Sequence, residues 1–235
     1  MEGTMKVAVM TGKKKMEWCE RDIPQPGPGE LQIKLEYVGV CGSDLHFYSE
    51  GRLANWVPDG PLVLGAGCIG LVTLMSLKAR GVSEIYVADV LDKRLEKARE
   101  LGATRVFNSR NENIEEFVKT LPGGGVDQVY ECAGNRITTL QTCRLIKRAG
   151  KITLVGVSPE PVLELDIATL NAMEGTIYSV YRYRNLYPSA ISAVSKGLIP
   201  LKKIVSHTFD FKDVIEGVDY SLNHKDEVIK AVIRM

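Results

Sequence analysis

The sequence predicts an α/β protein whose core is a doubly wound parallel sheet, and three observations support this class. From residue 62 onward, short apolar runs alternate with segments of helical hydrophobic period, which is the order that β-α-β units require. Gly65, Gly67 and Gly70 form a G-x-G-x-x-G motif between the first apolar run and the first helical segment. The chain of 235 residues is 45% hydrophobic and 25% charged, which is typical of a globular protein with a buried core.

The predicted elements follow one another at short intervals. We expect strands at residues 62–64, 84–88, 104–107, 126–131, 151–155 and 176–181. We expect helices at residues 68–79, 92–101, 114–121 and 138–148, with Asp92 capping the second of them and Gly102 ending it. Six strands with short crossovers complete the sheet, and a helix near 189–196 and a strand at 228–235 follow it.

The first 61 residues have a different pattern. Residues 5–9 and 31–38 alternate apolar and polar side chains, which is the period of a half-buried strand. Between them, the Pro- and Gly-rich run at 24–29 excludes a helix and requires a turn. We therefore predict three regions: a β segment at 1–61, a dinucleotide-binding domain at 62–181 and a C-terminal segment at 182–235.

The glycine motif and an acidic residue together predict a cofactor site. The motif opens a helix after an apolar strand, and Asp89 lies 19 residues after Gly70, at the end of the next strand. In a Rossmann domain Gly65 permits the turn, Gly67 lets the backbone approach a pyrophosphate, and Gly70 allows close packing. Asp89 would bind an adenosine ribose and repel a 2′-phosphate, so NAD is expected rather than NADP. The alternative is a nucleotide-free domain that uses these glycines for packing.

Composition argues against several other classes. The net charge is +1 without a basic stripe, so no nucleic-acid partner is expected. The longest apolar run, near residues 69–77, is too short to span a membrane, and no secretory signal is apparent, so the cytoplasm is the expected location. Five scattered cysteines argue against a disulfide framework, and three dispersed histidines complete no zinc-ligand set.

Three motifs resemble those of one enzyme family. They are Gly-Val-Cys-Gly-Ser-Asp-Leu-His at 39–46, Val-Leu-Gly-Ala-Gly-Cys-Ile-Gly at 63–70 with Asp89, and R-Y-x-N-x-Y-P-x-A-I at 182–191. Over nearly its whole length the chain is similar to zinc-dependent medium-chain dehydrogenases, and most similar to the sorbitol (L-iditol) dehydrogenase group. The first two motifs are specific to the superfamily, and the third points to its polyol branch.

The resemblance implies roles for individual residues. Cys41 matches the first catalytic zinc ligand, and Ser43 and His46 match the relay that carries the alcohol's proton to solvent. Arg182 and Tyr183 match positions near the polyol and the nicotinamide. Zinc would lower the pKa of the substrate alcohol, and hydride would pass from its carbinol carbon to NAD. The expected cofactor-binding set is Gly65, Gly67, Cys68, Ile69, Gly70, Asp89, Arg94, Cys132, Ala133, Val155 and Gly156.

The chain departs from the family pattern at one point. In the family, the Val-Leu-Gly that follows the first loop leads into His-Glu and a long block, whereas here residues 63–65 lead directly into Ala66 and Gly67. That block carries the second zinc ligand, the structural zinc lobe and much of a GroES-like barrel. We therefore expect a truncated GroES-like β segment, formed from N- and C-terminal pieces, and no structural zinc. A catalytic zinc needs about three protein ligands, so with Cys41 as the single remaining family ligand, a small residue in a glycine-rich turn is the favoured interpretation of that position.

These observations lead to a functional expectation with two alternatives. The leading hypothesis is NAD-dependent oxidation of a polyol or secondary alcohol to a ketone, impaired in this chain by the loss of zinc ligands. The small-molecule alcohol is the expected partner, in a homo-oligomer. The second hypothesis is a non-catalytic NAD-binding or assembly module that pairs with a full-length subunit through the edge of the sixth strand. A zinc-independent reductase is the third.

Overall fold

The computed structural model describes residues 3–12, 14–30, 32, 60–182 and 185–235. The chain divides into two compact units, residues 1–57 and 58–235. In the first unit, β1 (Thr4–Gly12) and β2 (Lys15–Asp22) form an antiparallel hairpin in which Val7 lies opposite Cys19. The predicted strand at 5–9 is confirmed within β1. The predicted strand at 31–38 lies outside the described residues except for Gln32, which belongs to no strand.

The second unit contains the predicted doubly wound sheet. Its six strands are all parallel and have the order β5-β4-β3-β6-β7-β8. The strands are β3 (Leu62–Leu64), β4 (Tyr86–Asp89), β5 (Arg105–Asn108), β6 (Val126–Glu131), β7 (Ile146–Leu154) and β8 (Thr176–Ser179). The order reverses between β3 and β6, and ligands of such sheets bind in the crevice at this switch point.

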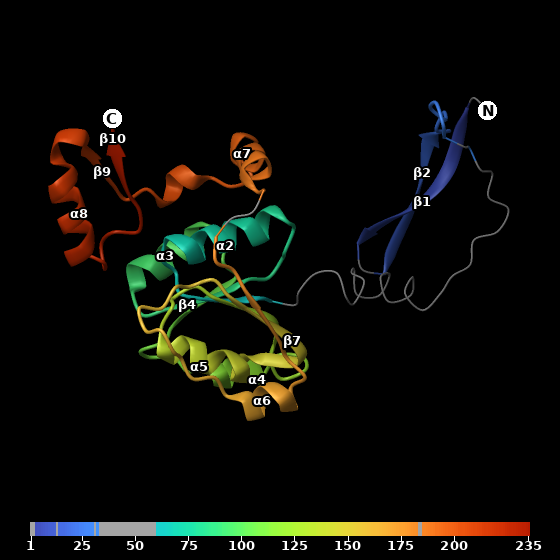
Figure 1. Ribbon diagram of the computed structural model, residues 1–235. Helices are drawn as coiled ribbons and strands as arrows, with labels where there is room; N and C mark the ends of the chain where they lie inside the picture. The colour runs from blue at the N-terminus through green and yellow to red at the C-terminus, as the bar shows by residue number, and fades with distance from the viewer. Residues whose placement is uncertain (1–2, 13, 31, 33–59, 183–184) are drawn as a thin grey trace. The chain divides into compact units, whose positions relative to one another are not determined.

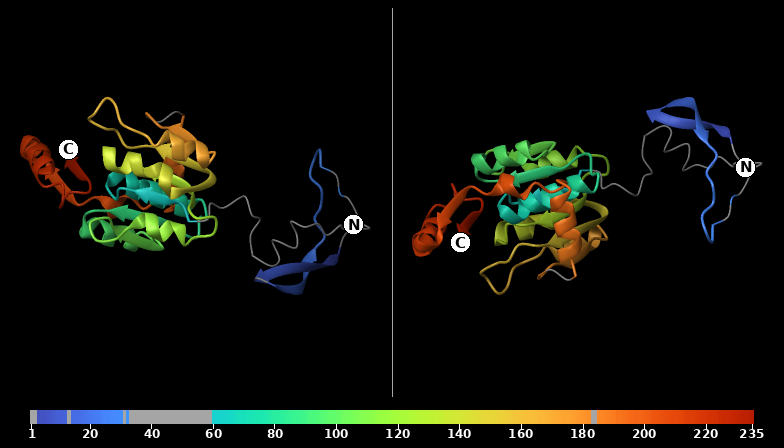
Figure 2. Two further views of the ribbon diagram at one scale, coloured as in Figure 1. Left: turned by 90° about the horizontal axis from the view of Figure 1, so that it is seen from below. Right: turned by 90° about the horizontal axis from the view of Figure 1, so that it is seen from above.

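Helices cover both faces of this sheet. The crossover helices are α2 (Cys68–Ala79), α3 (Asp92–Glu100), α4 (Ile114–Lys119) and α5 (Arg136–Leu145), and the short α6 (Ile167–Ala172) precedes β8. Figure 1 places α2 and α3 on one face and α4 and α5 on the other, and Figure 2 looks onto these two faces from below and from above. The chain thus runs outward from β3 through β4 to β5 on one side of the sheet and from β6 through β7 to β8 on the other.

The core lies between the sheet and these helices. Leu62 to Leu64 are buried, as expected for a central strand with both faces covered. Phe107 and Tyr86 pack against Phe117 of α4, with ring centroids 4.6 and 5.1 Å apart. The buried residues of α2 are Gly70, Leu71, Leu74, Met75 and Leu77. This burial anchors the strand and the helix that flank the glycine motif.

Two local expectations are wrong. The helix expected at 138–148 is α5, which ends at Leu145, because Ile146 is buried and pairs with Val126 as the first residue of β7. Asp92 does not cap α3. The N-cap residue is Leu91, and the Asp92 carboxylate accepts a hydrogen bond of 2.7 Å from the side-chain amide of Asn108 instead. Gly102 follows the end of α3 with a φ of 97°, in agreement with the expected helix stop.

The remaining C-terminal elements are less buried. They are α7 (Tyr187–Ser195), a 3-10 turn at Leu201–Ile204, β9 (His207–Asp210), a second 3-10 turn at Phe211–Asp213, α8 (Val214–Asn223) and β10 (Ala231–Arg234). β9 and β10 form a two-stranded parallel pair. The expectation of a helix near 189–196 and a final strand is confirmed, whereas β9 and α8 were not expected. Gly217 lies in the middle of α8, where a Cβ would come within 2.7 Å of the Phe209 ring.

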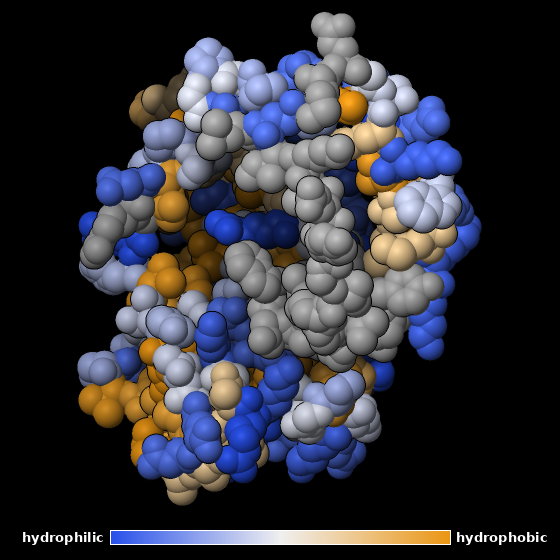
Figure 3. Space-filling model, turned by 90° about the vertical axis from the view of Figure 1, so that its right-hand side faces the viewer, coloured by the Kyte–Doolittle hydropathy of each residue, from blue (hydrophilic) through white to orange (hydrophobic). Residues whose placement is uncertain are grey.

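No helix in the described ranges is long and apolar enough to cross a membrane. Apolar side chains nevertheless reach the surface in several places on the face drawn in Figure 3. The most exposed large ones, over the described residues, include Trp18, Ile137, Val157, Val162, Tyr181, Ile215 and Met235.

Candidate cofactor site

Gly65 makes a turn that no other residue would fit. Its φ is 92°, in the region that favours glycine, and its N–H donates to the Ala88 carbonyl at 2.7 Å. A Cβ on Gly65 would lie 2.9 Å from the backbone nitrogen of Ala133. The turn therefore needs glycine both for its dihedral angle and for the approach of the loop after β6.

Gly70 and Gly67 have different environments. A Cβ on Gly70 would lie 1.7 Å from the Gly65 carbonyl oxygen, so only glycine lets α2 pack this closely. Among the described residues, a Cβ on Gly67 would meet only Arg94 Nη1, at 3.8 Å. Gly67 is the N-cap of α2; in the described part of the chain no side chain caps the helix, and its first turn holds no acidic residue. The helix N-terminus thus offers free N–H groups and a positive dipole end beside an uncrowded glycine.

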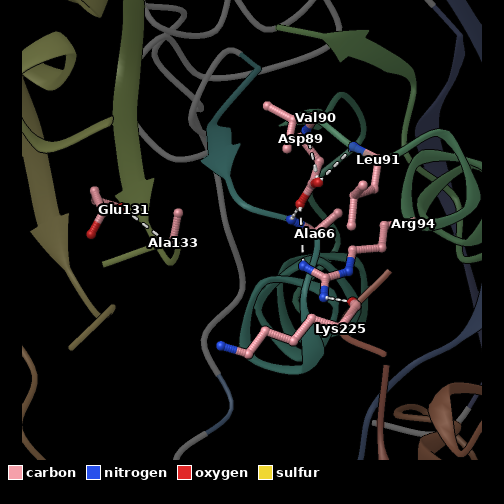
Figure 4. A network of polar contacts seen from close by, with 8 residues as sticks. All are labelled: Ala66, Asp89, Val90, Leu91, Arg94, Glu131, Ala133 and Lys225. Carbon is pink, nitrogen blue, oxygen red and sulfur yellow. Dashed lines mark hydrogen bonds and ion pairs between the residues drawn. The ribbon is translucent and has the colours of Figure 1, made fainter. Parts of the chain in front are cut away.

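Asp89 is tied to this turn through its carboxylate. Oδ2 accepts the Ala66 N–H at 2.6 Å, and Oδ1 accepts the N–H groups of Val90 and Leu91 at 2.7 and 2.9 Å (Figure 4). The residue is 9% exposed. A carboxylate has about four lone-pair positions, so one remains on Oδ2 for a further donor.

Arg94 of α3 stands next to that remaining position. Its Nη1 lies 4.0 Å from Asp89 Oδ2, and its Nη2 donates to the carbonyl of Lys225 in the C-terminal segment (Figure 4). Its Nε is buried and has no hydrogen-bond partner among the described residues. Arg94 therefore places positive charge between Asp89 and Gly67, where a phosphate or ribose group would approach.

Glu131 is a buried carboxylate that the sequence analysis missed. It ends β6 and is 1% exposed. Oε1 accepts three hydrogen bonds, from the N–H groups of Ala133 and Gly134 at 2.9 Å each and from the Thr138 hydroxyl at 2.8 Å. Its position at the carboxyl end of a parallel strand, like that of Asp89, was the available signal.

The remaining expected cofactor residues lie at the ends of α2, β6 and β7. Cys68 and Ile69 open α2, and the backbone nitrogens of Val155 and Gly156 both donate to the Glu131 carbonyl at 2.8 Å. Cys132 contacts the Thr73 hydroxyl through its sulfur at 3.7 Å. Burial raises the pKa of the Cys132 thiol to about 12, so the thiol is protonated at neutral pH and is a poor nucleophile or metal ligand.

Of the residues expected to act in catalysis, substrate binding or metal binding, the structure describes Arg182 alone. Cys41, Ser43, His46 and Tyr183 lie outside the described residues. Arg182 is exposed, with its guanidinium 4.9 Å from the centre of the Tyr181 ring. Within the described part of the chain, no three His, Cys, Asp or Glu side chains converge as a metal-binding group.

Comparison with known proteins identifies the family models that the chain matches. A model described as zinc-binding dehydrogenase matches residues 68–196, and a model described as alcohol dehydrogenase GroES-like domain matches residues 27–87. The zinc-type alcohol dehydrogenase-like protein YdjJ of Escherichia coli is 41% identical over 178 residues. That match covers 74% of this chain and 50% of YdjJ, so the chain spans half of the length of this relative.

Two further comparisons extend this match. Sorbitol dehydrogenase of Bacillus subtilis aligns over 341 positions, with 22% identity, across 97% of both proteins. Because the alignment is much longer than the 235 residues of this chain, the relative contains a large segment without a counterpart here. The crystal structure of 2R,3R-butanediol dehydrogenase from Bacillus subtilis superposes with a TM-score of 0.70 and 27% identity, covering 77% of this chain and 52% of that one.

Proposed function

The chain belongs to the zinc-binding dehydrogenase family, and from that premise we propose that it binds NAD at the turn formed by residues 65–70. One observation carries the proposal: the buried Asp89 carboxylate is hydrogen-bonded to the same turn that exposes the N-terminus of α2. A dinucleotide needs both features at once, because its pyrophosphate requires N–H donors and its ribose requires an acceptor.

The residues of this chain suit the two ends of the adenosine diphosphate group. The first N–H groups of α2, with Gly67 leaving room for close approach, would hold the pyrophosphate. The remaining lone pair on Asp89 Oδ2 would accept a ribose hydroxyl, with Arg94 beside it. The charge of Asp89 disfavours a 2′-phosphate, and the single cation of Arg94 offsets that charge without reversing it, so NAD is preferred to NADP. When bound, NAD supplies a hydride acceptor.

The substrate class of the parent enzyme is proposed from the relatives. Sorbitol dehydrogenase and 2R,3R-butanediol dehydrogenase are named for small polyols or secondary alcohols. We propose that this chain derives from an NAD-dependent enzyme that oxidises such an alcohol to a ketone. We further propose that its own oxidation activity is impaired, with the missing block joined at residues 63–67.

A matched pair of glycine variants tests the cofactor proposal. In G67A the new methyl group would meet Arg94 at an ordinary contact distance, and the φ of −70° suits alanine, so the variant should fold. We expect NADH binding, measured by fluorescence titration, to weaken at least about tenfold because the methyl group occupies the path of the pyrophosphate. In G70A the methyl group would collide with Gly65, so the melting temperature itself should fall.

The same titrations could also refute the cofactor proposal. Wild-type protein that binds no NADH at high concentration would refute the proposal, as would G67A binding NADH as tightly as wild type. NADPH should bind more weakly than NADH.

A second candidate function is assembly through the edge of β8, with a full-length dehydrogenase subunit or with a second copy of this chain. Among the described residues β8 is the last strand of the sheet, and Tyr178, Val180 and Tyr181 near its outer edge are 50%, 47% and 80% exposed. The Val180 N–H donates inward to Leu154, so the N–H of Ser179 points to the open edge. S179P should therefore lower the mass measured by light scattering if copies pair through β8, and S179A should not. Equal masses for both variants, or a monomeric wild type at all concentrations, would argue against self-association through this edge.

A further inference from the structure

We propose that Glu131 is a positioning residue that holds the backbone groups facing the nicotinamide half of the cofactor. The inference rests on the proposed NAD binding. Its starting point is that Glu131 is almost completely buried, at 1% exposed, and forms no ion pair with the described residues. A buried carboxylate without a cation is costly unless hydrogen bonds compensate it, and here three donors converge on one oxygen.

The three donors come from two different elements. Ala133 and Gly134 lie in the loop after β6, and Thr138 lies in the first turn of α5. The backbone carbonyl of the same glutamate accepts from Val155 and Gly156 after β7. One residue therefore joins the loop after β6, the start of α5 and the loop after β7.

The loop that Glu131 holds is packed backbone against backbone. A Cβ on Gly156 would lie 2.4 Å from the Gly134 nitrogen and 2.9 Å from Glu131 Oε2. A Cβ on Gly65 would lie 2.9 Å from the Ala133 nitrogen. With no side chain between these segments, a small shift of the loop would be passed on to the phosphate turn on one side and to β7 on the other.

The order of the strands indicates which half of the dinucleotide would lie near Glu131. Asp89 ends β4 and Glu131 ends β6, on opposite sides of β3 (Figure 4). A dinucleotide lies across the switch point, with its adenosine ribose at the acid that follows the second strand. The nicotinamide half then lies over the ends of β6 and β7. Asp89 thus contacts the adenosine half directly, whereas Glu131 acts through the loops that it holds.

The experiment compares two ligands that differ only in the nicotinamide ring. NADH and ADP-ribose share the adenosine diphosphate group and the second ribose, and their dissociation constants are measured by calorimetry for wild type and E131Q. Glutamine keeps the shape but gives neutral, weaker hydrogen bonds. We expect NADH binding to weaken roughly tenfold and ADP-ribose binding to change less than about twofold. E174Q, which alters an exposed glutamate paired with Arg148, is the matched control and should change neither.

A second pair of variants keeps the test decisive if E131Q does not fold. T138V removes one donor to Glu131 and should weaken NADH relative to ADP-ribose, whereas T138S keeps the hydroxyl and should restore the wild-type ratio. Equal weakening of both ligands, or no weakening of either, in folded E131Q or T138V would overturn the positioning role. Failure of the wild type to bind either ligand would instead overturn the proposed NAD binding.

Discussion

The sheet region, residues 60–179, and the C-terminal region, residues 186–235, have similar helices and strands but differ in burial. The sheet region buries 26 of the 27 hydrophobic residues that form the described core, and the C-terminal region contributes only Ile204. α7 has no buried residue, and α8 buries only Gly217. The sheet region is therefore built around its own core, whereas the C-terminal region presents most of its apolar side chains to solvent.

The contrast is sharpest between α2 and α8. In α2, Leu71 and Leu74 are fully buried against the core. In α8, Ile215, Val218 and Leu222 follow a helical period yet are 77%, 61% and 60% exposed. A helical apolar stripe thus indicates a face suited to burial, and the packing partner decides whether the face is buried. The cofactor turn depends on the region that has such partners.

The largest expected effect on stability comes from making the same leucine-to-alanine substitution in α2 and in α8. L71A should lower the free energy of unfolding by about 2–5 kcal/mol, because it leaves a cavity beneath α2. L222A should change it by less than about 0.5 kcal/mol, because the side chain is already exposed. Urea unfolding of both variants measures the difference. A loss of 2 kcal/mol or more for L222A would show that the exposed face of α8 is covered in solution. It would contradict the difference in burial between the two regions.

The sequence predicts the sheet region better than the C-terminal region for a physical reason. The β-α-β pattern repeats, and each buried strand such as 62–64 is bounded by turn residues, so element type follows from local sequence. The extension of β7 back to Ile146 depends on its pairing with Val126, which no local pattern reveals. α8 was missed because Gly217 interrupts its helix propensity, although that glycine is needed beneath the Phe209 ring.

Part of the candidate site, like part of the fold, could be predicted from the sequence. Gly65, Gly70 and Asp89 could be found because each satisfies a backbone or charge requirement at a fixed spacing. Glu131 was missed because its importance comes from three donors that converge on it only in the folded chain. Arg94 was in the expected cofactor set, but its hydrogen bond to the Lys225 carbonyl joins residues far apart in the sequence and could not be predicted. A residue's role can be predicted when it depends on neighbours in the sequence. It cannot be predicted when it depends on groups that come together only in the folded chain.

A smaller effect is expected on the pH dependence of the free energy of unfolding. Each of the two regions contains a group with a raised pKa, and the causes of the two shifts differ. In the sheet region, burial raises the pKa of Cys132 to about 12. In the C-terminal region, the pKa of Tyr220 is raised chiefly by its hydrogen bond to Glu227. Since the folded pKa of Cys132 exceeds its unfolded value, its stabilising contribution is complete below about pH 9 and is lost as the pH rises toward 12.

C132A isolates this contribution by removing the thiol. The free energy of unfolding of the wild type should fall, between about pH 8.5 and pH 10, by about 1 kcal/mol more than that of C132A. Subtracting the C132A curve removes the titration of other groups, including Tyr220, and urea unfolding at several pH values gives both curves. Iodoacetamide at pH 8 should also modify Cys132 more slowly in the folded than in the unfolded protein. Parallel pH curves for the two proteins would mean that the thiol ionises as freely as an exposed one, and that this part of the sheet region is as open to water as the C-terminal region.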